Sequence, residues 1–538
     1  MGGRKVSFDE LAELPEGWVW AKLGELGLFI NGDRGKNYPN KNALVESGIP
    51  FINAGHIQDG IIKLSEMNYI TEESFNLLGS GKVKPNDILY CLRGSLGKTA
   101  IVKNITQGAI ASSLVIIRPC NSSKHEYLFY YLISPFGDAE IRKYDNGSAQ
   151  PNLSAQSVKS YSIPLPPLNE QRRIVAKIEA LAARSQRVKE ALLDIPQLLD
   201  QFRQSVLAAA FRGDLTADWR EQSSNVEPAE VLLERIRAER RRRWEESELE
   251  KMKASGKTPK DDKWKGKYIE PEAVSNEELP EIPEGWIWTD INNISFVVRG
   301  ASPRPAGDPK YFGGNIPWIT VAEITKDDEI YLTQTSGFVT AEGCKASRFI
   351  EPGTFLLTNS GATLGVPKIT KIGGCINDGS VALLFVNGEI QIYLYYFLTS
   401  LTQTLRKINQ GAAQPNLNTE IVRNIKIPIP PQEELQVIIK LLKHQLSTVS
   451  ELKTLVNNKL ELAVTLDQSI LAKAFRGELV PQDPNDEPAS VLLERIREER
   501  AKLQTKTAKK STTKTSARRT KKTHPQEEES VQLELGLE

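Results

Sequence analysis

The stretch Gly94-Ser-Leu-Gly-Lys-Thr99 contains the residue types that could most readily carry chemistry. A glycine-rich turn that ends in Lys and Thr can hold the phosphates of a nucleotide. That pattern requires a glycine five residues before Gly97, where the chain has Leu92 instead. A related stretch, Ser360-Gly-Ala-Thr-Leu-Gly-Val366, has valine in place of the lysine that would reach the phosphates. We therefore interpret both stretches as glycine-bearing turns between strands and not as nucleotide sites.

Other catalytic patterns are also missing from the sequence. An adenine methyltransferase needs an aromatic residue after Asn/Asp-Pro-Pro, but Pro166-Pro167 is followed by Leu168 and Pro430-Pro431 by Gln432. Asp261-Asp-Lys263 resembles the end of a metal-dependent nuclease motif, but no upstream strand supplies the further acidic residue, so we interpret it as part of a linker. The four cysteines and four histidines are scattered, which predicts free thiols and no zinc site. We expect no catalytic residues and no bound metal.

The bulk properties are those of an ordinary globular protein of several packing units. The chain has 538 residues, of which 40% are hydrophobic and 25% charged, and its formal net charge is +1. No apolar run is long enough to span a membrane, and no signal peptide is evident, so we expect a cytoplasmic protein without membrane contact. A near-neutral chain is not typical of a protein that binds nucleic acid tightly by itself.

The sequence is internally duplicated, with an offset that stays between 260 and 268 residues. The recurring pairs are Leu14-Pro-Glu-Gly-Trp-Val-Trp20 with Ile282-Pro-Glu-Gly-Trp-Ile-Trp288, Ile49-Pro-Phe-Ile52 with Ile316-Pro-Trp-Ile319, Ala149-Gln-Pro-Asn-Leu153 with Ala413-Gln-Pro-Asn-Leu417, Ile163-Pro-Leu-Pro-Pro167 with Ile427-Pro-Ile-Pro-Pro431, Ala210-Phe-Arg-Gly-Asp-Leu215 with Ala474-Phe-Arg-Gly-Glu-Leu479, and 227–237 with 487–497. The framework is kept in both copies while the loop tips differ. Two similar platforms with different loops are expected to bind two related but unlike targets.

Each copy is predicted to begin with a mixed α/β globular part. Residues 87–92 and 114–118 are typical of strands, and residues 127–132 and 392–398 of short buried helices. The four tryptophans of the first motif could stack on bases, but we favour a role in fixing the first strand of each copy to its core. They are Trp18, Trp20, Trp286 and Trp288.

A long helix follows each globular part. Apolar residues alternate at steps of three and four, which predicts a heptad seam between the two helices. The predicted seam residues are Ile174, Ile178, Leu181, Val188, Leu192, Leu199, Phe202, Ile438, Leu442, Val449, Leu452, Val456, Leu466 and Ile470. We expect Asn169 to cap the first helix, Gly213 to end it and Pro196 to kink it.

Antiparallel packing of these helices would put the two globular parts at opposite ends, related by an approximate two-fold axis. Helices of about forty residues span about 60 Å, which sets an upper limit on the distance between the two globular parts. Parallel packing stays open, because the linker after Arg243 is long enough to double back.

The combination of motifs resembles the specificity subunit of type I restriction-modification systems, over nearly the whole of residues 14–500. The resemblance implies a mixed α/β (α+β) fold in which two target-recognition domains are joined by two helices packed as an antiparallel coiled coil. The implied domains are target-recognition domain 1 at 1–167, helical region 1 at 168–244, a charged linker at 245–280, target-recognition domain 2 at 281–431, helical region 2 at 432–500 and a disordered tail at 501–538.

The resemblance also implies a non-catalytic function. The expected partners are double-stranded DNA with an asymmetric two-part target, methyltransferase subunits that dock on the helices, and motor-nuclease subunits. No cofactor is expected on this chain, since S-adenosylmethionine, ATP and Mg²⁺ belong to the partners. The candidate DNA-binding residues are Asn53, His56, Arg93, Ser95 and Lys98 in the first copy, and Thr320, Glu323, Asn359, Ser360 and Thr363 in the second.

Two other hypotheses compete with this one. A helical scaffold of an enzyme complex would bind partner subunits without reading bases. A self-sufficient nuclease or methylase would be active as the purified chain alone. The near-zero net charge predicts that DNA affinity depends on the methyltransferase partners, and tight specific binding by the isolated chain would contradict that prediction.

Overall fold

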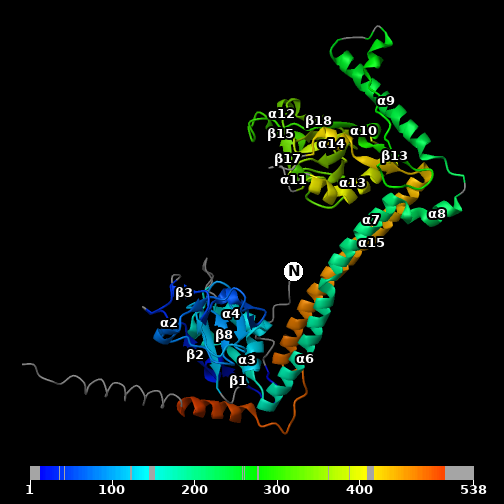
Figure 1. Ribbon diagram of the computed structural model, residues 1–538. Helices are drawn as coiled ribbons and strands as arrows, with labels where there is room; N and C mark the ends of the chain where they lie inside the picture. The colour runs from blue at the N-terminus through cyan, green and yellow to red at the C-terminus, as the bar shows by residue number, and fades with distance from the viewer. Residues whose placement is uncertain are drawn as a thin grey trace, which may run out of the picture. The chain divides into compact units, whose positions relative to one another are not determined.

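The computed structural model describes residues 13–35, 37–40, 43–120, 124–144, 152–223, 225–256, 259, 261–275, 278–361, 363–386, 388–408 and 417–502 (Figure 1). The chain divides into two compact units. The first unit comprises Met1–Leu193 and Asn458–Glu538, and the second comprises Asp194–Asn457. Each unit combines a globular head with parts of the long helices and is described by itself. We call residues 18–165 the first head and residues 286–429 the second head.

The first head is built from small antiparallel and mixed sheets. One sheet has the order β2 (Gly27–Asn31), β11 (Leu114–Pro119), β8 (Ile88–Cys91), β9 (Thr99–Ile101), and a second has the order β10 (Ala109–Ile110), β4 (Ile49–Ile52), β7 (Tyr69–Ile70), β3 (Leu44–Val45). The pairs β1 (Val19–Lys22) with β12 (Ser162–Leu165) and β5 (Ile57–Gln58) with β6 (Ile61–Ile62) complete it. The helices are α1 (Leu23–Leu26), α2 (Glu72–Leu77), α3 (His125–Leu132), α4 (Pro135–Tyr144) and α5 (Ala155–Lys159). The predicted strands at 87–92 and 114–118 and the predicted helix at 127–132 are confirmed.

The second head repeats this plan. Its larger sheet has the order β14 (Phe296–Arg299), β22 (Ser380–Leu384), β19 (Phe355–Thr358), β20 (Pro367–Thr370), β16 (Tyr331–Leu332), and its smaller sheet has the order β17 (Gly337–Val339), β15 (Phe312–Ile319), β21 (Gly374–Ile376), β18 (Arg348–Ile350). The pair β13 (Ile287–Asp290) with β23 (Lys426–Ile429) corresponds to β1 with β12. The helices are α10 (Ile291–Ile294), α11 (Val321–Ile324), α12 (Ala341–Lys345), α13 (Gly388–Ile408) and α14 (Thr419–Arg423). The predicted helix at 392–398 is part of α13 and is confirmed.

The long helices run antiparallel within each unit. They are α6 (Leu168–Leu193), α7 (Ile195–Arg212) and α15 (Gln432–Phe475). In the first unit, Lys189 near the end of α6 pairs with Asp467 near the end of α15, at 2.5 Å. In the second unit, Asp200 near the start of α7 pairs with Lys453, also at 2.5 Å. The prediction of an antiparallel helix pair is confirmed in both units.

The ends of the helices follow local backbone chemistry. The predicted break near Pro196 is confirmed, because α6 ends at Leu193 and α7 starts at Ile195 with the proline in its first turn. Gly213 ends α7 in the left-handed conformation, with φ of 83°, as predicted. The prediction that Asn169 caps α6 is wrong, because the helix already begins at Leu168. The Asn169 side chain instead accepts a hydrogen bond from Arg172, at 3.0 Å.

The predicted seam is only partly buried. Ile174, Ile178, Ile438, Leu442, Val449 and Val456 are buried, and Leu181, Leu192, Leu199 and Ile470 are half-buried. The prediction is wrong for Val188, Phe202, Leu452 and Leu466, which are exposed by 53%, 47%, 41% and 54%. A straight α-helix drifts by about 20° per heptad relative to a strict seven-residue repeat. Heptad positions away from the central stripe therefore reach the surface.

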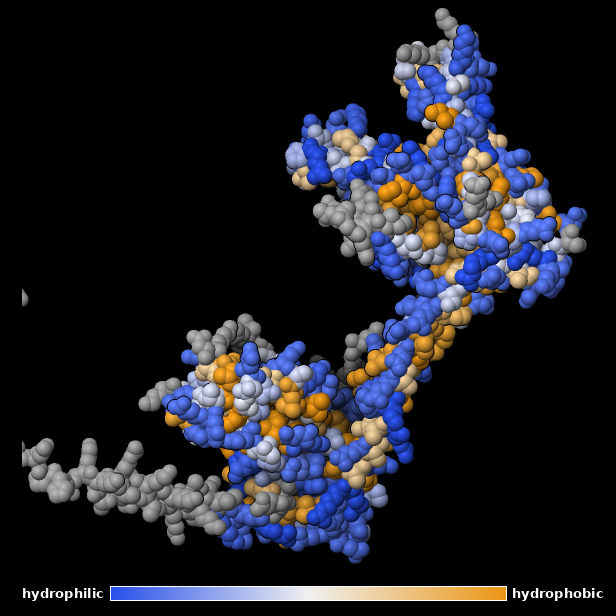
Figure 2. Space-filling view, in the orientation of Figure 1, coloured by the Kyte–Doolittle hydropathy of each residue, from blue (hydrophilic) through white to orange (hydrophobic). Residues whose placement is uncertain are grey.

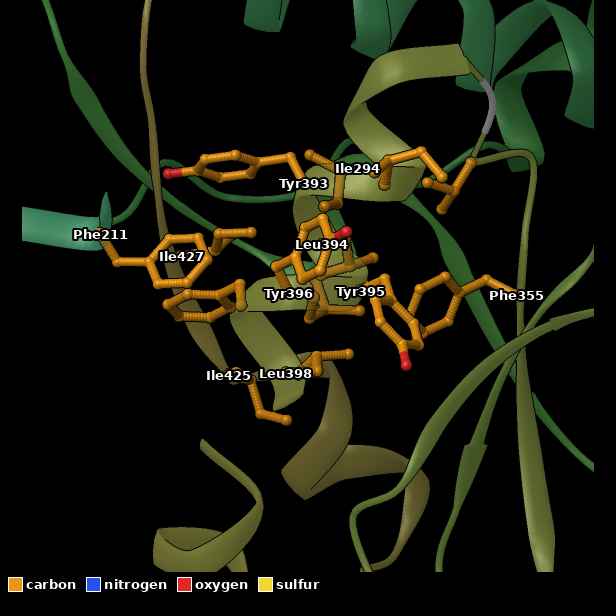
Figure 3. Close-up of a cluster of buried hydrophobic side chains, with 14 of the residues drawn as sticks. Phe211, Ile294, Phe355, Tyr393, Leu394, Tyr395, Tyr396, Leu398, Ile425 and Ile427 are labelled. Atoms are coloured by element: carbon orange, nitrogen blue, oxygen red, sulfur yellow. The ribbon is translucent and has the colours of Figure 1, made fainter. Parts of the chain in front are cut away.

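Aromatic residues join each head to a helix that arrives from the other half of the sequence. Phe475 at the end of α15 packs against Tyr127 and Tyr131 of α3, with ring centroids 5.2 and 5.5 Å apart. Phe211 at the end of α7 packs in the same way against Tyr393 and Phe397, at 5.2 and 5.1 Å. Figure 3 shows side chains of α13 between Phe211 and Ile427 on one side and Phe355 on the other. The Ala-Phe-Arg-Gly motif therefore supplies a core residue to each head.

Two buried carboxylates tie the first strand of each head to the start of a long helix. Trp18 donates from Nε1 to Glu170 at 2.9 Å, and Trp286 donates to Glu434 at 2.8 Å. Burial raises the pKa of Glu170, and the hydrogen bond from Trp18 opposes this shift. Glu434 also accepts from Thr216 at 2.6 Å and pairs with Arg220. Because these tryptophan rings are buried, the interpretation that they fix the first strand is confirmed for Trp18 and Trp286.

The predicted charged linker at 245–280 is more ordered than expected. Helix α9 (Ala229–Ala254) continues into it, and a 3-10 helix η5 spans Asp262–Lys267. Trp264 is buried and stacks on Trp244, with ring centroids 6.1 Å apart. The segment is charged overall, and its aromatic residues Trp264 and Tyr268 pack against Trp244 of α9. The residue ranges of the predicted domains stay predictions.

Candidate nucleic-acid interface

Backbone hydrogen bonds join the same three segments at one end of each head. They are the turn after β8 or β19, the turn before β11 or β22, and the segment at Leu153 or Leu417. In the first head, Leu92 N donates to Ser113 O at 2.8 Å, and Leu153 N donates to Leu92 O at 2.8 Å. In the second head, Asn359 N donates to Gly379 O at 3.0 Å, and Leu417 N donates to Asn359 O at 2.8 Å. These matching bonds make Leu92 equivalent to Asn359. The rest of the predicted Ala-Gln-Pro-Asn motif, residues 149–151 and 413–416, lies outside the described residues.

The strand before Asn53 reaches the same end. Ala111 N donates to Ile52 O at 2.7 Å, and the equivalent Asn377 N donates to Ile319 O at 3.1 Å. In the first head, the turn 111–113 therefore bonds both to the end of the strand before Asn53 and to the turn after β8. In the second head, the turn 377–379 bonds in the same way to the end of the strand before Thr320 and to the turn after β19. The structure thus brings the predicted residues of each copy to one end of its head.

Arg93, Ser95 and Lys98 lie on the turn between β8 and β9, and all three are exposed. Backbone bonds close the turn, with Cys91 N donating to Lys98 O at 2.9 Å and Gly97 N donating to Cys91 O at 3.1 Å. Arg93 donates from Nε to Asn152 Oδ1 at 3.3 Å, across an isolated β-bridge between the two residues. Because this hydrogen bond uses Nε, the terminal amino groups of Arg93 can donate to a base edge or to a phosphate.

Asn53 and His56 are committed to their own turn. The Asn53 side chain accepts from Gly55 N at 2.8 Å, and His56 Nδ1 accepts from Asn53 N at 3.1 Å. His56 is buried, and this burial lowers the pKa of its imidazole, so it is neutral at pH 7. These side chains shape the loop that follows β4 and have little freedom to contact a ligand.

Thr320 and Glu323 hold the equivalent position in the second head. Thr320 precedes α11 without a side-chain capping bond and is half-buried. Glu323 is buried and accepts hydrogen bonds from Ser336, including one from its backbone N at 2.7 Å. The hydrogen bond from the Ser336 hydroxyl lowers the pKa of Glu323. A paired, buried carboxylate of this kind stabilises a turn, and its charge would repel a nearby phosphate.

The remaining predicted residues, Asn359, Ser360 and Thr363, lie on the turn after β19. Ser360 and Thr363 are half-buried, and Thr363 O accepts from Thr358 Oγ1 at 2.6 Å. Asn359 is fully buried, and among the described residues neither its Oδ1 nor its Nδ2 has a hydrogen-bond partner. The prediction that the Asn359 side chain is presented to DNA conflicts with this burial. The DNA-binding roles of all the predicted residues stay predictions.

Replacing Asn359 with leucine, the residue at the equivalent position of the first head, is expected to stabilise the protein by about 1–3 kcal/mol, because it removes an unsatisfied buried amide. The measurement is the free energy of unfolding of the full chain in denaturant. The matched control is Leu92→Asn, which should destabilise the first head by a similar amount. A less stable Asn359→Leu variant would show that the amide has a partner that the described residues do not include.

Sequence reasoning missed a cluster of arginines at this end of the second head. Arg299 and Arg304 both contact Asp378 in the turn 377–379, and Arg348 of β18 bonds to the Arg299 backbone oxygen. The signal that could have found them is a difference between the copies. Arg299 lies opposite Val381 in β22, whereas Asn31 lies opposite the equivalent Val115 in β11.

No grouping of His, Cys, Asp and Glu side chains that could hold a metal ion occurs among the described residues. All four cysteines are free, and the thiols of Cys344 and Cys375 lie 2.8 Å apart. Burial and the neighbouring Cys344 raise the pKa of Cys375. In the described part of the chain, no helix is both long and apolar enough to cross a lipid bilayer.

Comparison with known proteins connects this geometry to a family. Residues 15–194 and 283–462 each match the family described as Type I restriction modification DNA specificity domain. The EcoKI specificity subunit of Escherichia coli strain K12 is 24% identical over 506 residues, covering 91% of this chain and 97% of that protein. The Escherichia coli EcoBI specificity subunit is 26% identical over 513 residues, covering 91% and 94%.

Solved structures share the fold. A chain from a study of the assembly and conformational transition of a type I R-M system has a TM-score of 0.62 at 21% identity, and the match covers 87% of this chain and 100% of that one. The HsdS subunit from Thermoanaerobacter tengcongensis has a TM-score of 0.53 at 21% identity, and the match covers 88% and 100%. The duplicated heads and long helices are thus a known architecture.

Proposed function

The chain belongs to the family of the type I restriction modification DNA specificity domain, and from this premise we propose that it is the non-catalytic DNA-specificity subunit of a type I restriction-modification complex. The observation that carries the proposal is that the two heads share a bonded framework but differ at its tips. Leu92, Arg93 and Ser112 in the first head are replaced by Asn359, Ser360 and Asp378 in the second. Each head reads one half of a two-part double-stranded DNA target, and the two halves differ in sequence.

Methylome sequencing of a host that carries this chain with its methyltransferase partner tests the proposal. We expect one asymmetric target with two unlike half-sites separated by a fixed spacer. Methylation of a palindrome with two identical half-sites would contradict it. A complex that forms but methylates without sequence preference would instead support the alternative, a helical scaffold that does not read bases.

Arg93 is the residue of the first head best placed to read a base. Its side chain is exposed and fixed by Asn152, and arginine pairs with the two acceptors of a guanine edge. Arg93→Ala is expected to weaken target binding about 10- to 100-fold and to relax one position of one half-site. Competition binding by the complete complex to duplexes with single base changes measures this. Lys84→Ala, at the other end of β8, is the control, and equal behaviour of the two variants would remove Arg93 from the interface.

The helices offer surfaces for the methyltransferase subunits. Hydrophobic side chains remain exposed on them in both units, and Figure 2 shows apolar residues along the helices. Those of the first unit are Val188, Leu193, Leu462, Val464 and Leu466, and those of the second are Leu198, Phe202, Leu452 and Leu455. Apolar side chains exposed on a soluble protein mark interaction sites when they occur together.

The partners complete the function of the chain. With a net charge of +1, the isolated subunit is expected to bind DNA weakly, and the docked methyltransferases supply most of the affinity. S-adenosylmethionine, ATP and Mg²⁺ act on the methyltransferase and motor-nuclease subunits, and the complex works in the cytoplasm. Nanomolar binding of target DNA by the isolated chain would contradict the assignment of affinity to the partners.

A further inference from the structure

Two arginines contact Asp378 at the tip of the second head, and a third arginine bonds to one of them. Arg304 Nη2 lies 3.5 Å from Asp378 Oδ2. The Ser302 hydroxyl donates a hydrogen bond to Asp378 Oδ1 at 2.6 Å. Arg299 donates from Nε to the backbone oxygen of Asp378 at 3.2 Å. Arg348 donates from Nε to the Arg299 backbone oxygen at 2.8 Å, which brings a third guanidinium to the same place.

The cluster is exposed but held in place. The Arg304 side chain is 72% exposed, and those of Arg299 and Arg348 are exposed as well. The bonds that fix Arg299 and Arg348 use Nε, so within the described residues their terminal amino groups have no assigned partner. Three guanidiniums against one carboxylate leave a local charge of +2. A positive group of this kind suits the phosphates and base edges of DNA.

The fold does not require these charges. In the first head the same turn contains Ser112 instead of Asp378, and Asn31 instead of Arg299, and the backbone bonds that fix the turn are kept. In that turn, Arg34 donates to Ser112 O at 3.4 Å. The cluster is therefore a difference between the two reading surfaces and not part of their common framework.

The cluster adjoins the predicted DNA-binding turn. Asn359 N donates to Gly379 O, in the residue after Asp378. A Cβ on Gly379 would lie 3.2 Å from the Ser360 hydroxyl and 3.2 Å from the Asn377 amide, so Ser360 borders the same turn. The arginines thus extend the surface that the sequence pattern identified.

We propose that Arg304, oriented by Asp378, reads a guanine in the half-site of the second head, while Arg299 and Arg348 bind flanking phosphates. The inference rests on the proposed function and assigns its residues in the second head. The carboxylate is a positioning residue with two effects. It orients the guanidinium for bidentate pairing with guanine, and it repels phosphate when the base is wrong, which lowers binding to non-target DNA.

The test uses the complete complex and a set of duplexes that carry every single base change in both half-sites. Arg304→Ala is expected to lose about 10- to 100-fold discrimination at one guanine position of one half-site. Arg304→Lys keeps the charge but not the bidentate fork, so it should lose the discrimination and retain non-target affinity. Arg235→Ala is the control, because Arg235 is an exposed, ion-paired arginine on α9. If Arg304→Lys discriminates as well as the natural protein, base reading by Arg304 is overturned.

Asp378→Ser tests whether Asp378 positions the Arg304 guanidinium. The variant carries serine, as the first head does at the equivalent Ser112. It should raise non-target affinity several-fold while it lowers discrimination at the same guanine, a combination that simple loss of structure cannot produce. Arg299→Ala and Arg348→Ala should each reduce the slope of log affinity against log salt by about 0.9. If the natural complex shows no sequence preference, the proposed function fails. If the natural complex is selective and Asp378→Ser and Arg304→Ala behave like Arg235→Ala, this inference alone fails.

Discussion

Phe475→Ala is expected to cost about 3–5 kcal/mol of unfolding free energy in the first unit, the range for removing a fully buried aromatic ring. Phe475 is completely buried, and its ring contacts Tyr127 and Tyr131 of α3. Tyr127 and Tyr131 cannot move into the space without breaking hydrogen bonds, since their hydroxyls donate to Pro164 O and Ser162 O. The cavity therefore persists, and its energetic cost is large.

Denaturant unfolding of the full chain, followed by tryptophan fluorescence, measures this effect, because Trp18 belongs to the same hydrophobic cluster as Phe475. Phe211→Ala in the second unit is the matched variant and should cost somewhat less, since Phe211 is slightly exposed. Phe475→Leu should recover part of the loss. An unchanged unfolding transition in Phe475→Ala would show that the head does not depend on this helix for its core.

Phe475 makes the first head depend on the second half of the sequence. It ends a helix that starts in the second half of the sequence, yet it completes the core of the first head. Residues 489–502 then continue along the same head, where Ala489 N donates to Gly17 O at 2.9 Å and Arg497 pairs with Glu25 at 2.8 Å. The first head is thus not an independent N-terminal domain, and loss of this joint is expected to impair recognition of its half-site.

The sequence allowed accurate prediction where local chemistry decides the outcome. The duplication, the strands around β8 and β11, the end of α7 at Gly213 and the break before Pro196 all follow from short-range rules on backbone conformation and hydrophobic pattern. The joints between distant segments carried a weaker signal. The Ala-Phe-Arg-Gly motif was evident as a repeat, but only the structure shows that its phenylalanine belongs to a head.

The candidate site was predicted less well, because polarity alone does not decide exposure. Asn359 is polar and borders a turn, yet it occupies the core position of Leu92. His56 and Glu323 look like ligand-binding side chains, yet His56 bonds to Asn53 of its own turn and Glu323 bonds to Ser336. Arg348 and Asp378 lie far from Arg299 and Arg304 in sequence, and the folded sheet brings these residues together. Comparing the copies position by position would have found Asn359 and Asp378 as departures from the first head.

Phe202→Asp is expected to weaken binding of the methyltransferase subunit at least 30-fold, which corresponds to about 2 kcal/mol, the threshold for a central interface residue. Phe202 was predicted to be a buried seam residue, but its ring is 47% exposed on α7. An exposed aromatic residue among the exposed leucines at 198, 452 and 455 is the type of anchor that protein interfaces favour. Because the ring is partly in water, the free energy of unfolding should change by no more than about 1 kcal/mol.

The measurement is titration of the purified methyltransferase subunit onto the full chain, with calorimetry as the readout. Ile269→Asp is the matched control, since Ile269 is an even more exposed aliphatic side chain outside the long helices. Leu462→Asp tests the corresponding helix surface in the first unit, and it should reduce the number of bound methyltransferase subunits or their affinity. Equal binding by Phe202→Asp, Leu462→Asp and Ile269→Asp would show that the docking surface lies elsewhere than on these helices. An unpaired charge buried in an interface would weaken binding strongly.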